Sequence, residues 1–182
     1  LERANLAADQ ARQIVDKLLV YSRREDKAEQ ERVELSVIVK QTLELVHAQL
    51  RQDGVQVEVE LASVPPVMGS SLELRQVLTN LLLNARDAAL SPGSTATDSK
   101  IQTRCHDGWV YVQVLDHGPG VAPEIERRIF EPFFTTKEVG RGTGLGLSIS
   151  HRIAVTYGGA LEYEPPPGGG ACFSLRLPAL QA

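Results

Sequence analysis

The sequence has few cysteines, few aromatic residues and no long apolar run. Its two cysteines, Cys105 and Cys172, are far apart and lack paired spacing, so we expect reduced, buried thiols rather than a disulfide framework. No apolar segment is long enough to cross a bilayer, and no signal peptide opens the chain. The net charge of −4 argues against a general nucleic-acid binder, whose phosphate contacts need a basic face. The 182 residues suffice for one well-packed domain and an appendage.

The first 24 residues contain neither glycine nor proline, and their apolar residues follow a helical pattern. The stripe consists of Ala4, Ala7, Ala11, Ile14, Leu18 and Tyr21. This period is typical of a helix packed against other helices, and a helix folded back on its own domain is the alternative. Residues 23–32 are charged and poor in apolar side chains, which indicates a linker or an exposed helix end. Because the chain begins with Leu1 rather than Met, we expect a piece of a longer protein.

From Val33 onward, helical and alternating patterns are mixed. The spacing predicts helices over 36–52 with Ser36 as the cap, 71–90, 123–129 and 145–157. It predicts strands over 55–61, 101–105, 109–115, 160–164 and 172–177. Together they favour an α+β two-layer sandwich, in which a mixed, mainly antiparallel sheet has its helices on one face.

Two asparagines mark the second of these helices. Asn80 and Asn84 are one turn apart, so both amides leave the same helix face. Amides at the border of an apolar face are costly unless something pairs with them. An amide oxygen can ligate magnesium without repelling phosphates, and such a metal would accompany its nucleotide and keep several waters. The alternative is a pair of solvated asparagines.

A carboxylate ends the strand 109–115. Asp116 is followed by Gly118 and Gly120, which leave the backbone beside it free of side chains. The adenine amino group is a suitable donor for Asp116, whereas guanine would present a carbonyl and leave two facing acceptors, at a cost of about 1–3 kcal/mol. By itself the pattern is also typical of an ordinary turn.

Two further strings lie close together, Phe130 to Lys137 and Arg141 to Ser148. Glycines that lead into a helix expose backbone N–H groups at its positive end, which favours a phosphate site. Lys137 and Arg141 add positive charge beside it. We expect residues 135–143 to form a flap that is mobile without nucleotide and anchored by the aromatic residues before it. The string is neither a Walker A loop nor a Rossmann loop.

Together, these four strings resemble the N box, first glycine box, F box and second glycine box of the GHKL superfamily. That group includes sensor histidine kinases, DNA gyrase B, mismatch-repair ATPases and a heat-shock chaperone. The resemblance covers Val33 to Pro178 and implies the Bergerat fold with ATP and Mg²⁺ as cofactors. The Asn84-Ala-Arg-Asp87-Ala string and the short lid most resemble the kinases related to nitrogen and C4-dicarboxylate sensors.

The resemblance implies a set of site residues. Those expected to bind the nucleotide are Asn80, Asn84, Asp87, Asp116, Gly118, Gly120, Lys137, Arg141, Gly142, Thr143, Gly144, Leu145, Gly146 and Leu147. Asn80, Lys137 and Arg141 are expected to act in catalysis, and Asn84 to hold the metal.

One position separates kinases from hydrolases. In the superfamily's ATPases a glutamate general base precedes the magnesium asparagine by four residues, and here that position is Asn80, which has no useful basicity. This favours phosphoryl transfer over hydrolysis.

The sequence also departs from the kinase pattern. Asp87 replaces a common lysine, Ala171 a common threonine, and Ser70 a common aspartate as a helix cap. No histidine has the acidic residue and nearby proline of a phosphoacceptor box; the four are His47, His106, His117 and His151.

We therefore expect residues 1–25 to be the second helix of a dimerisation hairpin, 26–32 a linker, and 33–180 the ATP-binding catalytic domain of a sensor histidine kinase. The expected partners are the dimerisation domain, a second protomer and a response-regulator receiver domain, without nucleic acid or membrane contact by this chain. We expect a cytoplasmic domain, and we expect any inner-membrane anchor of the full-length protein to lie upstream of this chain. The alternatives are a nucleotide-sensing or phosphatase-control module, a GHKL ATPase, and a serine-specific anti-sigma kinase, against which the first helix argues.

Overall fold

The computed structural model describes residues 29–91, 98–137 and 142–181. The helix expected at the start of the chain lies outside these residues, as does Arg141. The helices and strands follow in the order β1 (Glu31–Val33), α2 (Leu35–Gln52), β2 (Gln56–Leu61), β3 (Val67–Gly69), α3 (Ser71–Ala89), β4 (Asp98–His106), β5 (Trp109–Asp116), α4 (Gly146–Thr156), β6 (Ala160–Glu164) and β7 (Ala171–Pro178). Among these, no helix is both long and apolar enough to span a bilayer.

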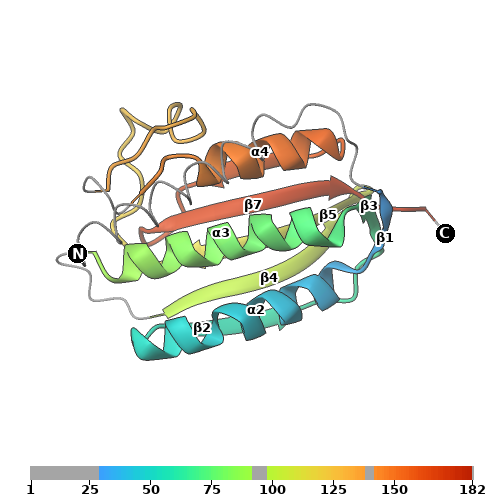
Figure 1. The fold of residues 1–182 in the computed structure, drawn as a ribbon, viewed down its shortest axis with the longest axis horizontal. Helices are drawn as coiled ribbons and strands as arrows, with labels where there is room; N and C mark the ends of the chain where they lie inside the picture. The colour runs from blue at the N-terminus through green and yellow to red at the C-terminus, as the bar shows by residue number, and fades with distance from the viewer. Residues whose placement is uncertain (1–28, 92–97, 138–141, 182) are drawn as a thin grey trace, which may run out of the picture.

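A five-stranded sheet forms one layer, with the strand order β2-β4-β5-β7-β6 (Figure 1). The β2–β4 pair is parallel, and the other three pairs are antiparallel. The β4–β5 hairpin turns at Asp107 and Gly108, whose φ angles are 49° and 77°. Positive φ at both turn residues matches the twist of the flanking strands, which is why Asp-Gly suits this position.

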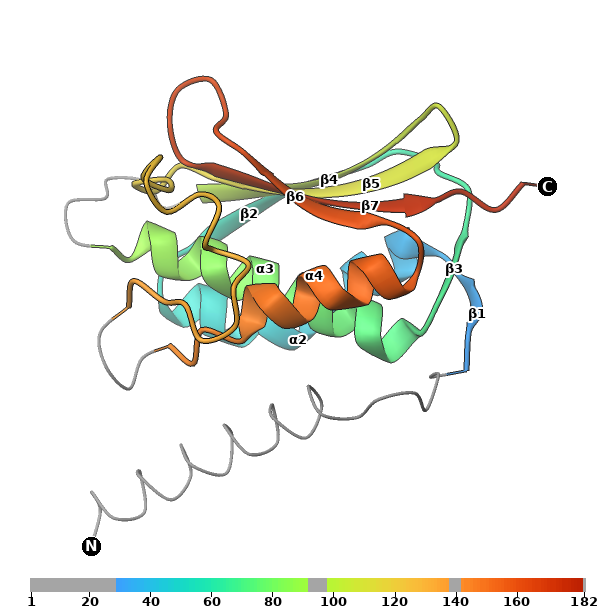
Figure 2. The same ribbon diagram turned by 90° about the horizontal axis from the view of Figure 1, so that it is seen from above.

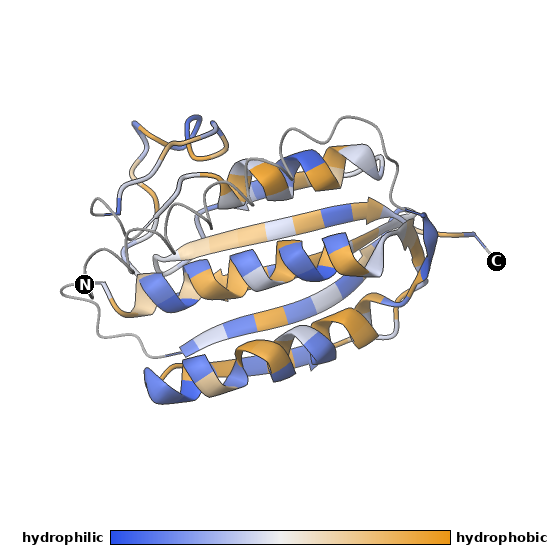
Figure 3. Cartoon of the chain, in the orientation of Figure 1, coloured by the Kyte–Doolittle hydropathy of each residue, from blue (hydrophilic) through white to orange (hydrophobic). Residues whose placement is uncertain are grey.

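The three helices α2, α3 and α4 form the second layer and cover one face of the sheet (Figure 2). Bands of apolar residues alternate with polar ones along all three helices (Figure 3). The apolar side of α3 is fully buried through Leu74, Leu78 and Leu81, and the facing strands contribute Val112 and Leu175. The α+β two-layer sandwich predicted from the sequence is therefore confirmed.

The strands β1 and β3 form a second, two-stranded sheet. In it, β1 pairs antiparallel with β3, so that Glu31 lies opposite Gly69. The Ser71 hydroxyl donates a hydrogen bond of 2.6 Å to the Glu31 carboxylate. Glu31 and Arg32, which the sequence pattern placed at the end of a linker, therefore lie in a strand of the folded domain. Three-residue strands carry too little periodicity to be recognised from the sequence.

Three local expectations were wrong. α2 begins at Leu35 with Glu34 at the cap position and no side-chain cap, so Ser36 lies inside the first turn. Residues 123–130 form successive turns rather than a helix: the N–H groups of Ile125 and Arg128 each bond to the carbonyl three residues earlier, and a single helical bond, from the Ile129 N–H to the Ile125 carbonyl, is not repeated. Of the two free thiols, Cys172 is buried as expected, but Cys105 is exposed beside the β4–β5 turn.

Candidate nucleotide-binding site

The C-terminal half of α3, the end of β5 and the start of α4, which carry most of the described site residues, lie at the same end of the domain (Figure 1). Glycines permit this approach. A Cβ on Gly118 would lie 2.7 Å from the Ala88 Cβ, and one on Gly146 would lie 2.1 Å from the Asn80 Oδ1. Side chains at these two positions would therefore push the loop after β5 and the start of α4 away from α3.

Asn80 joins the two helices that flank the site. Its Nδ2 donates a hydrogen bond of 3.1 Å to the hydroxyl of Ser150, which is only 1% exposed. Asn80, where the resemblance implies a general base in the superfamily's ATPases, is thus an amide bonded to α4. Ser150 was not predicted as a site residue; its spacing of four from Gly146 on a helix is the signal that places it near the same face.

Asn84 and Asp87 lie on the next turn of α3 and share one cation. The Lys137 Nζ donates to the Asn84 Oδ1 at 3.2 Å and pairs with the Asp87 Oδ2 at 2.5 Å. The Arg86 Nη1 lies 3.3 Å from the other Asp87 oxygen, and the Arg86 Nε pairs with Asp53. The structure therefore brings together Asn84, Asp87 and Lys137, as the sequence predicted, and adds Arg86, which the sequence did not indicate.

The donor set around Asn84 fits a metal that arrives with a nucleotide. Its half-buried amide oxygen offers one hard ligand, and Mg²⁺ commonly takes one or two protein ligands, phosphate oxygens and several waters. In the described part of the chain, no three His, Cys, Asp or Glu side chains gather in a way that would hold a metal ion.

Asp116 is the most buried carboxylate of the site. It is 4% exposed, and its Oδ1 accepts a hydrogen bond of 2.9 Å from the backbone N–H of Gly118. Burial raises the pKa of Asp116 above its ordinary value, while hydrogen bonds from the N–H groups of Gly118 and Ala171 oppose that shift. Around it, the backbone packs tightly: a Cβ on Gly170 would lie 1.9 Å from the Asp116 carbonyl oxygen, and one on Gly120 would lie 2.7 Å from the Gly170 carbonyl oxygen.

The two glycine-rich and aromatic strings meet at Phe133 and Gly144. The Phe133 N–H donates to the Gly144 carbonyl at 2.9 Å, and both residues have positive φ, 68° and 66°. A Cβ on Gly144 would lie 2.3 Å from the Phe133 carbonyl carbon. Phe133 is 58% exposed, whereas Phe134 packs against the core and carries the Arg128 guanidinium 4.5 Å from its ring centroid. Phe134 is thus the aromatic residue that anchors this string through its side chain, whereas Phe133 is held through its backbone N–H.

The start of α4 is suited to an anion. Leu145 holds the cap position, is fully buried, and gives no side-chain cap to the helix. The first N–H groups of a helix carry partial positive charge and are available to a phosphate when no side chain caps them. Gly142, Thr143, Gly144 and Leu147, which the sequence predicts as phosphate-binding residues, are half-buried. Four residues of the predicted flap, 138–141, lie outside the described residues.

Two of the histidines near the site have local partners. The His151 ring lies 5.4 Å from the Phe130 ring between centroids, and the His117 Nδ1 lies 3.5 Å from Asp98. His151 therefore belongs to the packing between α4 and the Phe130 string.

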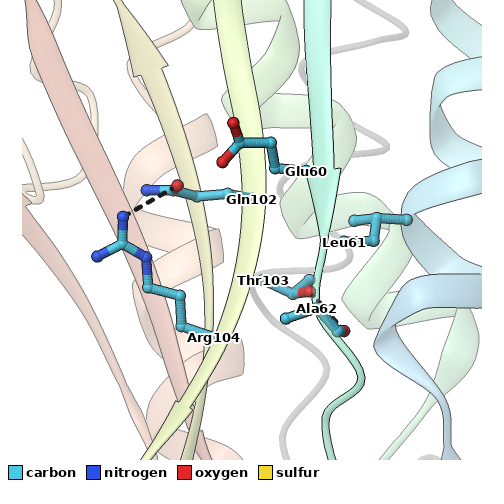
Figure 4. A pocket seen from close by; sticks show the side chains of 6 residues that line it. All are labelled: Glu60, Leu61, Ala62, Gln102, Thr103 and Arg104. Carbon is cyan, nitrogen blue, oxygen red and sulfur yellow. Dashed lines mark hydrogen bonds between the residues drawn. The ribbon is translucent and has the colours of Figure 1, made fainter.

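A separate depression of about 390 Å³ lies on β2 and β4 (Figure 4). Glu60, Gln102 and Arg104 project from one side of these strands, with Arg104 bonded to Gln102 at 3.1 Å. It contains no residue of the predicted nucleotide site, and an open sheet face explains it.

Known proteins resemble the chain in both sequence and fold. Residues 69–181 match the family described as "Histidine kinase-, DNA gyrase B-, and HSP90-like ATPase". The two-component sensor PprA of Pseudomonas aeruginosa is 46% identical over 133 residues, which are 71% of this chain and 14% of PprA. The C4-dicarboxylate transport sensor protein DctB of Rhizobium meliloti is 41% identical over 112 residues, which are 60% of this chain and 17% of DctB. The chain thus spans less than a fifth of either relative.

A crystal structure of full-length ShkA in complex with AMPPNP superimposes with a TM-score of 0.82 at 28% identity, covering 97% of this chain and 37% of ShkA. The predicted resemblance to the C4-dicarboxylate sensor group is confirmed by DctB. The chain belongs to the histidine kinase-, DNA gyrase B- and HSP90-like ATPase family, and it corresponds to the ATP-binding catalytic domain of the sensor histidine kinases.

Proposed function

We propose that this chain binds magnesium–ATP and transfers the γ-phosphoryl group to a histidine on a dimerisation domain. The observation that carries the proposal is that Asp116, Asn84, Lys137 and the uncapped start of α4 are assembled around one end of α3. This combination offers an acceptor for a base, a ligand for a metal and donors for phosphates.

Each residue has a role that follows from its surroundings. The buried Asp116 carboxylate accepts from the adenine amino group, and the Gly118 N–H fixes its orientation. The N–H groups from Gly146 onward and the Lys137 ammonium bind the phosphates. Asn84 holds Mg²⁺, which when bound neutralises charge on the β- and γ-phosphates. The domain division, with the catalytic domain over 33–180 and a dimerisation helix over 1–25, is part of the same proposal.

Phosphoryl transfer is favoured over hydrolysis by the surroundings of Asn80. An amide that donates to Ser150 has no lone pair of useful basicity for a water proton. Transfer to an imidazole requires little covalent catalysis by the protein, because the loose transition state is stabilised by positioning and by neutralisation of charge. The nitrogen of the imidazole bonds to the γ-phosphorus as the bond to the β-phosphate oxygen breaks, and ADP leaves. A receiver domain of a response regulator is the proposed final acceptor.

The test is a transfer assay in two parts. The chain is incubated with labelled ATP, alone and with a separately expressed hairpin that contains a histidine box. We expect acid-labile label on the hairpin and none on the chain, and loss of transfer with Asn84→Ala. A hairpin whose histidine is replaced by alanine is the control. Label on the chain would contradict the proposal, and an unlabelled hairpin despite measured ATP binding would favour the nucleotide-sensing module.

A further inference from the structure

One ion pair crosses the candidate site and links the end of the Phe130 string to α3. Lys137 and Asp87 are 50 residues apart, and their charged atoms lie 2.5 Å apart. Both side chains are about one-third exposed, at 35% and 32%. The pair is therefore accessible to a ligand that competes for either partner.

Asp87 has a different cation on each of its oxygens. Lys137 binds Oδ2, and the Arg86 guanidinium lies 3.3 Å from Oδ1. Arg86 is itself held by Asp53 through its Nε. If Lys137 leaves, Asp87 keeps Arg86 as its partner and does not become an unpaired anion beside the site.

Lys137 also occupies the oxygen that the proposed function assigns to magnesium. Its Nζ lies 3.2 Å from the Asn84 Oδ1. Two cations at contact distance from one amide oxygen repel each other strongly, because the amide carries no net negative charge that would offset the repulsion. Magnesium–ATP must therefore displace Lys137 from Asn84, and the phosphates are the nearest new partner for the ammonium.

We propose that Asp87 is a positioning residue for Lys137: it holds the lysine on the Asn84 oxygen, and magnesium–ATP binds by exchanging that contact for one between Lys137 and a phosphate. The inference rests on the proposed function. It accounts for an acidic residue at a position close to phosphates, since Asp87 acts there through Lys137 rather than on the nucleotide.

The test is a double-mutant cycle of wild type, Asp87→Asn, Lys137→Met and the double variant, read in two ways. The first reading is hydrogen exchange of residues 134–137 without nucleotide, where the Lys137 N–H donates to the Thr135 hydroxyl at 3.2 Å. We expect exchange about two- to fivefold faster in Asp87→Asn and in Lys137→Met, as for loss of a partly exposed ion pair, with no further increase in the double variant.

The second reading is calorimetry with a non-hydrolysable ATP analogue and Mg²⁺. Asp87→Asn should bind the analogue about two- to fivefold more tightly when Lys137 is present, because no pair has to be broken. The same substitution should change nothing in the Lys137→Met background. Equal tightening in both backgrounds would show that Asp87 acts directly on the phosphates, and no tightening in either would show that it does not hold Lys137; either result would overturn the proposal.

A matched control is Glu60→Gln, which removes the 2.6 Å Glu60–Lys100 pair on the sheet and should leave both readings unchanged. The exchange data separate the two levels of inference. Faster exchange in Asp87→Asn together with no analogue binding by any variant would overturn the proposed function and the exchange of partners, but would confirm the ion pair. Unchanged exchange together with normal analogue binding would overturn the inference alone.

Discussion

The Asn80 amide lies so close to the first residue of α4 that a Cβ on Gly146 would be 2.1 Å from its Oδ1. The same amide donates to Ser150 one turn further along α4. The Asn80–Ser150 hydrogen bond holds the start of α4, which has no side-chain cap, against α3. Gly146 is thus required by the side chain opposite it as well as by the phosphate loop.

Gly146→Ala should weaken both the fold and nucleotide binding. The added methyl group must displace Asn80 or α4, and overpacking of this kind typically destabilises a protein by about 1–3 kcal/mol. Urea unfolding measures the loss. The double variant Gly146→Ala/Asn80→Ala should recover part of the stability, because the clashing amide is gone. Equal losses in the single and double variants would mean that Asn80 is not what the methyl group meets.

The stability of the domain should depend on the ionisation of Asp116. Burial raises the pKa of this carboxyl above its ordinary value of 3.8, so the folded protein takes up a proton before the unfolded chain as the pH falls. The charged form costs stability at neutral pH, and the cost is relieved on acidification. Relative to Asp116→Asn, the wild type should therefore gain free energy of unfolding from neutral to mildly acidic pH. A wild type that loses stability relative to the variant over that range would contradict the argument.

The stability difference between the wild type and Tyr157→Phe should depend on pH in the alkaline range. The Tyr157 hydroxyl donates to the Glu73 carboxylate, and burial together with this contact raises its pKa from 10.0 to about 12. Loss of the hydrogen bond should destabilise the variant by about 0.5–1.5 kcal/mol below pH 10. Above pH 10 the unfolded tyrosine ionises first, so the advantage of the wild type should shrink and be lost by about pH 12. Thermal unfolding of the two proteins across this range measures it; a constant difference would exclude the contact.

Local patterns predicted most of the fold and the elements that carry several of the candidate site residues. The alternation of Val110, Val112 and Val114 with half-buried residues, and the asparagine pair on α3, are contained within single elements and are visible as periodicity. The end of β5 at Asp116 follows in the same way. These features need only neighbours along the chain.

Contacts between distant segments could not be predicted. Asn80 and Ser150 are 70 residues apart in the sequence, and Lys137 and Asp87 are 50 apart, so no local spacing reveals either pair. The three-residue strands β1 and β3 have no period to detect and form only because the chain brings them together. Ser36 was favoured as a cap by residue type, but the buried position of Leu35 makes the helix begin earlier.

The central claim, that Asp116 binds the adenine of ATP, is tested most directly by calorimetry of ATP and GTP binding with Mg²⁺, in the wild type and in Asp116→Asn. The Gly118 N–H donates to one oxygen of Asp116. In the variant the amide oxygen would keep this bond, so the amide NH₂ would face the adenine amino group. We predict that the wild type binds ATP and not GTP, and that the variant loses about tenfold or more in ATP affinity and most of its discrimination. Glu60→Gln, on the sheet, is the matched carboxyl control and should bind ATP as the wild type does. An Asp116→Asn variant with unchanged ATP affinity and unchanged discrimination against GTP would contradict the account.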